Sequence, residues 1–193
     1  MSTTKSGILA KWLVGGLLAA AAFTAPAQDL DKPVLLVAAP ETTGLYEGAV
    51  VVVVPKNGGH VGFMLNRGTR QTVASAFPNE PVSAKVIEPI YLGGPKAATQ
   101  MYAVLRRDPG EGARRLFGDV FVTVSGATVD RILVESPAEA RYFAGFVAWD
   151  AGELQEQVAE GEWLVTPAEE STLFHPQPDA MWADLMERIR NTF

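Results

Sequence analysis

The apolar pattern of the chain is most pronounced between Ala49 and Gly68. Five consecutive valines, Val50 to Val54, are stiff at χ1 and favour an extended backbone. Because every side chain in this run is apolar, we expect both faces of the strand to be covered, as in the centre of a sheet. Asn57-Gly58-Gly59 tolerates positive φ and favours a turn, after which His60 to Leu65 leads back. The pattern predicts a buried β-hairpin that ends at Asn66-Arg67-Gly68.

Shorter apolar runs predict further strands on either side of this hairpin. Most of them are bounded by proline, glycine or polar residues, as strands usually are. The polar segment 106–115 contains the turn signal Asp108-Pro109-Gly110, so we expect a loop there. The strands predicted besides the hairpin are residues 33–40, 89–92, 101–105, 120–125 and 163–166.

Apolar residues spaced three or four positions apart predict short helices in the remaining segments. We expect Thr69, Thr128 and Asp179 to cap three of them, because each side chain can accept a hydrogen bond from a first helical turn. A fourth helix covers residues 153–160. Residues 137–149 fit a helix about as well as a strand, and residues 167–178 form a loop. The last helix has an apolar stripe of Trp182, Leu185, Met186 and Ile189.

The first 27 residues differ in composition from the rest. Lys5 and Lys11 precede an apolar run from Trp12 to Ala22. Ala25-Pro26-Ala27 is a small-x-small site ahead of the polar Gln28. This three-part pattern is typical of a cleavable secretory signal. Its apolar core is shorter than the about 20 residues that a membrane-spanning helix needs. We therefore expect a signal peptide over residues 1–27 and a periplasmic or secreted protein.

Two alternatives to export stay open at this point. In the first, residues 1–27 form an uncleaved anchor, which would be the only contact with a membrane. In the second, the segment results from a misassigned start codon ahead of a cytoplasmic protein. If export holds, residues 28–32 form a flexible lead-in. Residues 33–193 then form a single domain, which suits their length.

The charge balance of the chain is acidic. There are 16 lysines and arginines against 22 aspartates and glutamates, a net charge of −6. Removing residues 1–27 removes two lysines and no acid, which takes the charge to −8. An acidic protein repels phosphate backbones, so nucleic acid is an unfavourable partner. The absence of cysteine excludes disulfides, thiolate zinc sites, thiol catalysis and lipoprotein processing.

The sequence contains no assembled catalytic or metal motif. His60 and His175 are its two histidines, too few and too far apart in sequence for a typical zinc site. A Gly-x-Ser-x-Gly elbow, a P-loop and a dinucleotide-binding fingerprint are all missing. We therefore expect no metal and no cofactor, and we assign no catalytic residues.

The sharpest candidate site is the Asn66-Arg67 pair. Arginine presents a rigid donor fork that suits carboxylate or phosphate, and here it follows a buried strand that reaches the surface. The alternative is an internal ion pair with an acid such as Glu88. Gly93-Gly94 is either a tight turn or a small nest of backbone N–H groups that binds an anion.

Our leading hypothesis is a non-catalytic binding or regulatory domain that takes a small anion or a protein partner. Its candidate ligand-binding residues are Asn66, Arg67, Gly93, Gly94 and His60, and we expect the two turns to lie side by side and form one pocket. A rival hypothesis is a hydrolase that uses Arg67 with His60. A third is a DNA-linked regulator, which requires a cytoplasmic location.

Several segments together resemble the YqgE/AlgH family. The similarity extends from about Pro33 to Ile189. Its most specific pieces are the Leu65-Asn66-Arg67 corner, the run Tyr91 to Pro95, and the run from Trp149 to Leu164. The segments are VLLVAAP, GFMLNRG, IYLGGP, VFVTVSGA, GFVAWDAGELQEQVAEGEWLVTPA and LFHPQPDAMWADLM.

The resemblance implies an α+β fold in which a mixed, bent β-sheet closes into a pseudo-barrel with peripheral helices in a single domain. It also implies that Tyr142 to Trp149 is a strand. The family has no agreed biochemical activity, and one branch is linked to control of alginate production and described as a transcriptional regulator. This chain departs from the family pattern at Gly68, where a proline is usual, and at Gly145 to Trp149.

Overall fold

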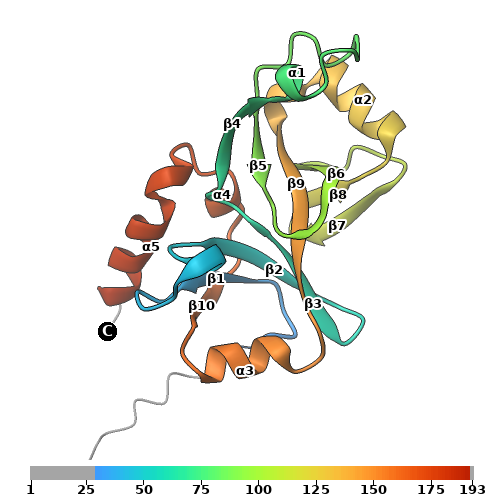
Figure 1. The fold of residues 1–193 in the computed structure, drawn as a ribbon. Helices are drawn as coiled ribbons and strands as arrows, with labels where there is room; N and C mark the ends of the chain where they lie inside the picture. Colours follow the sequence, from blue (N-terminus) through green and yellow to red (C-terminus); the bar gives the residue numbers. More distant parts are fainter. Residues whose placement is uncertain (1–28, 192–193) are drawn as a thin grey trace, which may run out of the picture.

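Strand β9 (Ala140–Trp149) joins the two parts of one curled sheet (Figure 1). Its last residues pair with β3 (Gly59–Met64), and its first residues pair with β5 (Pro89–Leu92) and β6 (Lys96–Leu105). The segment that fitted helix or strand is therefore mainly a strand, as the family resemblance implied. The structure, a computed structural model, describes residues 29–191, so the predicted signal at residues 1–27 lies outside the described residues.

The sheet has the strand order β10-β1-β2-β3-β9-β6-β8-β7, with β5 beside β9 and β4 beside β5. Its pairings are antiparallel except for β5 with β9. The sheet curls into a half-barrel with helices at its periphery (Figure 1), which confirms the expected α+β fold with a mixed, bent sheet. The remaining bounds are β1 Val34–Ala38, β2 Val50–Lys56, β4 Gly68–Thr72, β7 Ala113–Phe117, β8 Val120–Thr123, β10 Trp163–Pro167, α1 Val73–Ala76, α2 Gly126–Glu135, α3 Glu153–Ala159, α4 Glu170–Leu173 and α5 Met181–Arg190.

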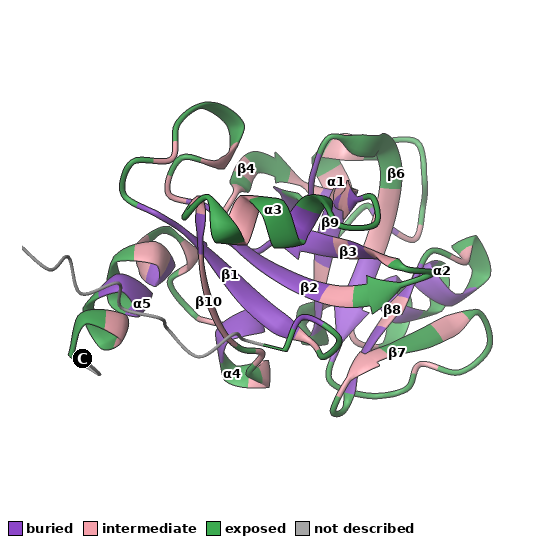
Figure 2. Ribbon diagram, turned by 90° about the horizontal axis from the view of Figure 1, so that it is seen from below, coloured by how far each residue is buried: buried purple, intermediate pink, exposed green. Residues whose placement is uncertain are grey.

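The valine run forms the centre of the fold over Val50 to Val53, as its pattern predicts, whereas Val54 is only half-buried. Val50 to Val53 are each at most 2% exposed, and alternate residues pack into two separate core clusters. One cluster contains Phe143 and the other contains Trp149. Figure 2 shows β1 and most of β2 buried. The turn between β2 and β3 has positive φ at Asn57 and Gly58, which explains why the chain reverses there.

The structure corrects all three predicted helix caps. Thr72, not Thr69, accepts the hydrogen bond from Ser75 at the start of α1, whereas the Thr69 hydroxyl donates to the Ile90 carbonyl at 2.7 Å. Thr69 lies in β4, which the sequence did not predict. Ser125 occupies the N-cap position just before α2, and Thr128 lies within the helix, so Thr128 does not cap it.

The C-terminal helix is also only partly as predicted. Its apolar stripe packs on the core, with Leu185 and Met186 buried. It begins at Met181 after a 3-10 turn that contains Asp179, which makes no capping hydrogen bond. Two predicted loops contain short regular elements: β7 lies partly within 106–115, and α4 lies within 167–178.

The lead-in expected at residues 28–32 is held against the core where the structure describes it. Leu30 is 9% exposed, and its carbonyl accepts a hydrogen bond from His60 Nε2 at 3.0 Å. Lys32 N–H closes a turn onto the Asp29 carbonyl. Within residues 29–191, none of the helices has the length and apolar character needed to cross a bilayer.

Candidate functional site

Asn66 holds the chain at the corner where it leaves β3. Its Oδ1 accepts a hydrogen bond from the Val50 N–H at 2.9 Å, and its Nδ2 donates to the Gly48 carbonyl at 2.8 Å. The residue is 8% exposed. Because both polar atoms of the amide are bonded to backbone, Asn66 stabilises the corner and does not present its amide to a ligand.

Arg67 follows Asn66 at the surface and is half-buried. Its guanidinium donates to the Glu47 carbonyl. Within residues 29–191 it forms no ion pair, so the pair with Glu88 that the sequence suggested is not formed. No carboxylate of the part of the chain that the structure describes therefore neutralises the Arg67 guanidinium.

The Gly93-Gly94 turn lies directly beside this corner. The Leu92 N–H donates to the Arg67 carbonyl at 2.8 Å, and the Met64 N–H donates to the Gly93 carbonyl at 2.9 Å. The Gly93 N–H itself donates to the Ala144 carbonyl at 2.8 Å. That N–H group is thus used within the sheet and is not presented to an anion.

Close packing explains why glycine occupies both positions of this turn. A Cβ on Gly93 would lie 2.2 Å from the Gly145 carbonyl oxygen, and one on Gly94 would lie 2.2 Å from the Phe146 carbonyl carbon. Both neighbours are backbone atoms, which cannot rotate away. The two glycines therefore allow the loop before β6 to approach β9.

A cavity of about 680 Å³ lies at this corner, and we call it the corner cavity. Arg67, Met64 and Leu92 line it, together with residues of the loop before β2 and Trp182 of α5. Gly93, Gly94, Asn66 and His60 are not among its lining residues. Of the five candidate residues, only Arg67 thus presents its side chain to this space.

His60 lies near the opposite end of β3 from this corner. It pairs with Pro55 and Trp149 in the sheet, and about 13 Å of strand separates it from Met64. Its side chain is buried and bonded to Leu30, and its Nδ1 has no partner within the described residues. The structure does not bring His60 and Arg67 together, so it provides no geometry for the hydrolase hypothesis.

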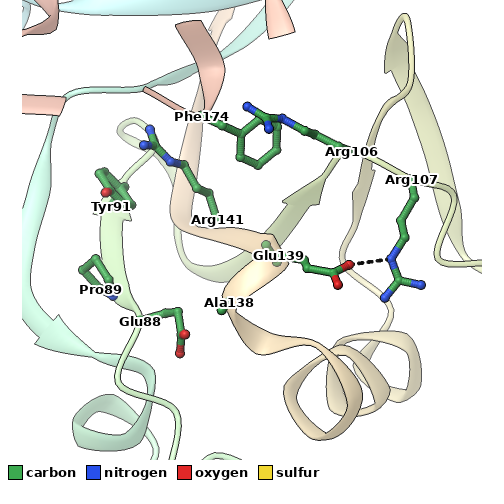
Figure 3. Close-up of a pocket in the computed structure, with 10 residues that line it drawn as sticks. Glu88, Pro89, Tyr91, Arg106, Arg107, Ala138, Glu139, Arg141 and Phe174 are labelled. Atoms are coloured by element: carbon green, nitrogen blue, oxygen red, sulfur yellow. Dashed lines mark hydrogen bonds and ion pairs between the residues drawn. The ribbon is translucent and has the colours of Figure 1, made fainter. Parts of the chain in front are cut away.

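A second cavity, of about 600 Å³, contains a cluster of arginines that sequence reasoning did not identify. We call it the arginine cavity. Arg106, Arg107 and Arg141 line it, with Tyr91 and Phe174 as aromatic walls. Figure 3 shows the Arg106 and Arg141 guanidinium groups near one end of the cavity and Glu88 toward the other.

Arg141 projects from β9 and is only partly bonded. Its guanidinium lies 5.1 Å from the Tyr91 ring centre, and Nη2 donates to the His175 carbonyl. Nη1 is buried and has no partner within the described residues. Burial lowers the pKa of Arg141, and the positive charge of Arg106 acts in the same direction. A buried donor without an acceptor costs about 1–3 kcal/mol.

Arg106 and Arg107 are adjacent in sequence but differ in their partners. Arg107 Nε lies 2.8 Å from Glu139 Oε2, so its charge is neutralised within the cavity wall. Arg106 packs 4.4 Å from the Phe174 ring centre and forms no ion pair in the part of the chain that the structure describes. The cavity therefore presents two arginines, Arg106 and Arg141, that lack a carboxylate partner among the described residues.

The sequence separates the residues of this cavity widely. Arg106 follows β6, Arg141 lies 35 positions later in β9, and Phe174 follows α4. The antiparallel pairing of β6 with β9 places Arg106 beside Arg141, and the chain after α4 adds Phe174. The signal in the sequence that could have indicated this cavity is Arg141, a charged residue within an otherwise apolar strand. Within residues 29–191 there is no group of three or more side chains suited to hold a metal ion.

Comparisons with known proteins agree on one family. A family model described as "AlgH-like" matches residues 35–193. A UPF0301 protein of Chlorobium phaeobacteroides is 29% identical over 143 residues, covering 72% of this chain and 75% of that protein. A UPF0301 protein of Methylococcus capsulatus is 27% identical over 160 residues, covering 79% of this chain and 87% of that protein.

Solved structures show the same fold. The AlgH protein from Pseudomonas aeruginosa superposes with a TM-score of 0.70 at 20% identity, covering 86% of this chain and 91% of the other. A protein from Corynebacterium diphtheriae gives a TM-score of 0.67 at 23% identity, covering 83% and 87% of the two chains. At these identities the likeness concerns the fold alone.

Proposed function

The chain belongs to the AlgH-like family, and we propose that it is a non-catalytic binding protein whose arginine cavity takes a small anionic ligand. The observation that supports this most directly is the pair Arg106 and Arg141, which line one cavity and have no carboxylate partner within residues 29–191. A fixed guanidinium fork matches a carboxylate or a phosphate, and partial burial strengthens the attraction. Arg141 Nη2 donates to the His175 carbonyl and holds this guanidinium at the cavity.

The histidines support a binding role over a catalytic one. His60 is buried with Nε2 bonded to the Leu30 carbonyl. His175 Nδ1 lies 3.2 Å from the Gln177 N–H, and its Nε2 lies 3.7 Å from Asp184. Neither lines the arginine cavity or the corner cavity. A general base must lie within hydrogen-bond reach of the group that it deprotonates, and these two side chains are used within the fold.

A titration with inorganic phosphate and with acetate tests the anion site. We expect amide signals near Arg106 and Arg141 to shift in NMR spectra of the labelled protein at constant ionic strength. Replacing Arg106 by glutamine should weaken binding about tenfold or more, because a hydrogen bond to a charged group contributes about 1.5–3 kcal/mol. Arg106 is exposed, so this variant should fold normally.

Arg70→Gln is the matched control for this titration. Arg70 is an exposed arginine of β4 that lines neither cavity, so its loss removes the same charge elsewhere. We expect it to leave binding within about twofold of the parent. Equal binding by the parent and Arg106→Gln would reject the arginine cavity as the anion site.

We also propose that the domain acts outside the cytoplasm, as a periplasmic or secreted protein. The basic, apolar and small-residue pattern of residues 1–27 supports this, and the absence of cysteine is compatible with an oxidising compartment. Cell fractionation followed by sequencing of the mature N-terminus should find the protein outside the cytoplasm, beginning at Gln28. An intact N-terminus in the cytoplasmic fraction would contradict the proposal.

A further inference from the structure

A third cavity, of about 510 Å³, lies inside the curl of the sheet. It is lined by residues of the β2–β3 hairpin on one side and of the β7–β8 hairpin on the other. Because β9 and β6 stand between β3 and β8 in the strand order, these hairpins share one cavity only where the sheet curls around it. Figure 2 shows the tip of the β2–β3 hairpin near β8. We call this space the hairpin cavity.

The floor of the hairpin cavity is apolar and aromatic. Phe63, Tyr102 and Phe146 line it from β3, β6 and β9. Their rings form a continuous row, since Tyr102 lies 5.5 Å from Phe63 and 5.9 Å from Phe146 between ring centres. Tyr102 and Phe146 are only partly buried. An apolar body placed on these rings would therefore remove further apolar surface from water.

The rim of the cavity carries only positive charge. Its ionisable side chains are those of Lys56, Arg114 and Arg115, apart from the phenol of Tyr102, and it has no acidic lining residue. Lys56 and Arg114 are exposed and form no ion pair within residues 29–191. Arg115 packs on the Phe121 ring and approaches Asp119 only to 4.0 Å. This concentration of cations is unexpected on a chain with a net charge of −6.

We infer that the hairpin cavity binds an amphipathic anion, with an apolar chain on the aromatic floor and a carboxylate at the Lys56–Arg114 rim. The volume falls within the about 300–1,000 Å³ of typical ligand pockets, and an apolar lining with a few polar groups is the usual composition of such sites. The charge of the rim selects an anion over a cation of the same shape. This site is separate from the arginine cavity and does not rest on the function proposed above.

Isothermal titration with three probes tests this inference. Dodecanoate, kept below its micelle concentration, has both the chain and the carboxylate. Acetate has only the carboxylate, and dodecyltrimethylammonium has the same chain with the opposite charge. We expect dodecanoate to bind at one high-affinity site, beside any weaker carboxylate binding at the arginine cavity. Both other probes should bind this site at least about tenfold more weakly, since each lacks one of the two interactions. Equal binding of the cationic probe would overturn the inference.

Paired variants locate the site on the chain. Val124 lines the cavity and is 45% exposed, whereas Val134 of α2 is 67% exposed and does not line it. Val124→Asp places a negative charge in the cavity and should abolish dodecanoate binding, whereas Val134→Asp should leave it unchanged. The double variant Lys56→Gln/Arg114→Gln should weaken dodecanoate at least tenfold, and a thermal melt checks that each variant folds.

The outcomes also separate this site from the arginine cavity. Arg106→Gln should leave dodecanoate affinity unchanged if the two sites are distinct. Loss of dodecanoate binding in Arg106→Gln, with full binding in Lys56→Gln/Arg114→Gln, would overturn the inference. It would assign the amphiphile to the arginine cavity instead.

Discussion

Replacing Gly94 by alanine is expected to destabilise the protein by about 3 kcal/mol or more. An added Cβ would lie 2.2 Å from the Phe146 carbonyl carbon, 2.4 Å from its oxygen and 2.5 Å from the Val147 nitrogen. All three are backbone atoms of β9, the strand that joins the two parts of the sheet. Relief of the clash requires the loop to move away from β9, so the effect should appear as a lower urea midpoint.

Gly126→Ala is the matched control for this measurement. A Cβ at Gly126 meets no atom within 4 Å, and the residue is the first of α2. Alanine in a compatible helical position stabilises a protein by about 0.4–1 kcal/mol. A Gly94→Ala protein as stable as the parent would show that the turn is not closely packed on β9. That result would again favour the hypothesis that backbone N–H groups of Gly93-Gly94 form a nest that binds an anion.

Replacing Asn66 by alanine is expected to cost about 2–4 kcal/mol of unfolding free energy. The change removes the acceptor of the Val50 N–H and the donor to the Gly48 carbonyl. Each buried backbone group left without a partner costs about 1–3 kcal/mol, and the corner has little access to water because Asn66 is 8% exposed. Urea unfolding followed by tryptophan fluorescence measures the loss.

The neighbouring variant Arg67→Gln distinguishes the two residues of the corner. Arg67 is half-buried and donates to one carbonyl, that of Glu47. Its loss should change the unfolding free energy by less than about 1 kcal/mol. If Arg67→Gln proved more destabilising than Asn66→Ala, the guanidinium and not the amide would hold the corner.

Asn66 and Arg67 form one sequence motif, but the two side chains have different roles. Their position after a buried strand predicted a corner near the surface, and the Gly93-Gly94 turn does lie beside it. The sequence could not assign the amide to the backbone of residues 48 and 50, because those hydrogen bonds join segments 16 and 18 positions apart. Asn66 thus serves the fold, whereas Arg67 reaches the corner cavity.

The sequence did not identify the arginine cavity, because its lining residues also come from segments that are far apart along the chain. Arg106 begins a segment that the sequence predicts as a polar loop, and Arg141 lies in one that fits a helix about as well as a strand. Local pattern carries no information on which distant residues meet. Their meeting depends on β6 and β9 being neighbours in antiparallel register, with Leu105 opposite Ala140.

The sequence by itself determined the elements whose causes are local. The β-branched run of Val50 to Val54, the Asn57-Gly58 turn and the apolar stripe of α5 each follow from side-chain shape and spacing within a few residues. The tertiary structure alone decided which charged groups remain without partners. The pairing of β6 with β9 brings Arg107 to Glu139 and, within residues 29–191, leaves Arg106 and Arg141 at one cavity without a carboxylate partner. Electrostatic partnership depends on distance in space, and the fold sets that distance.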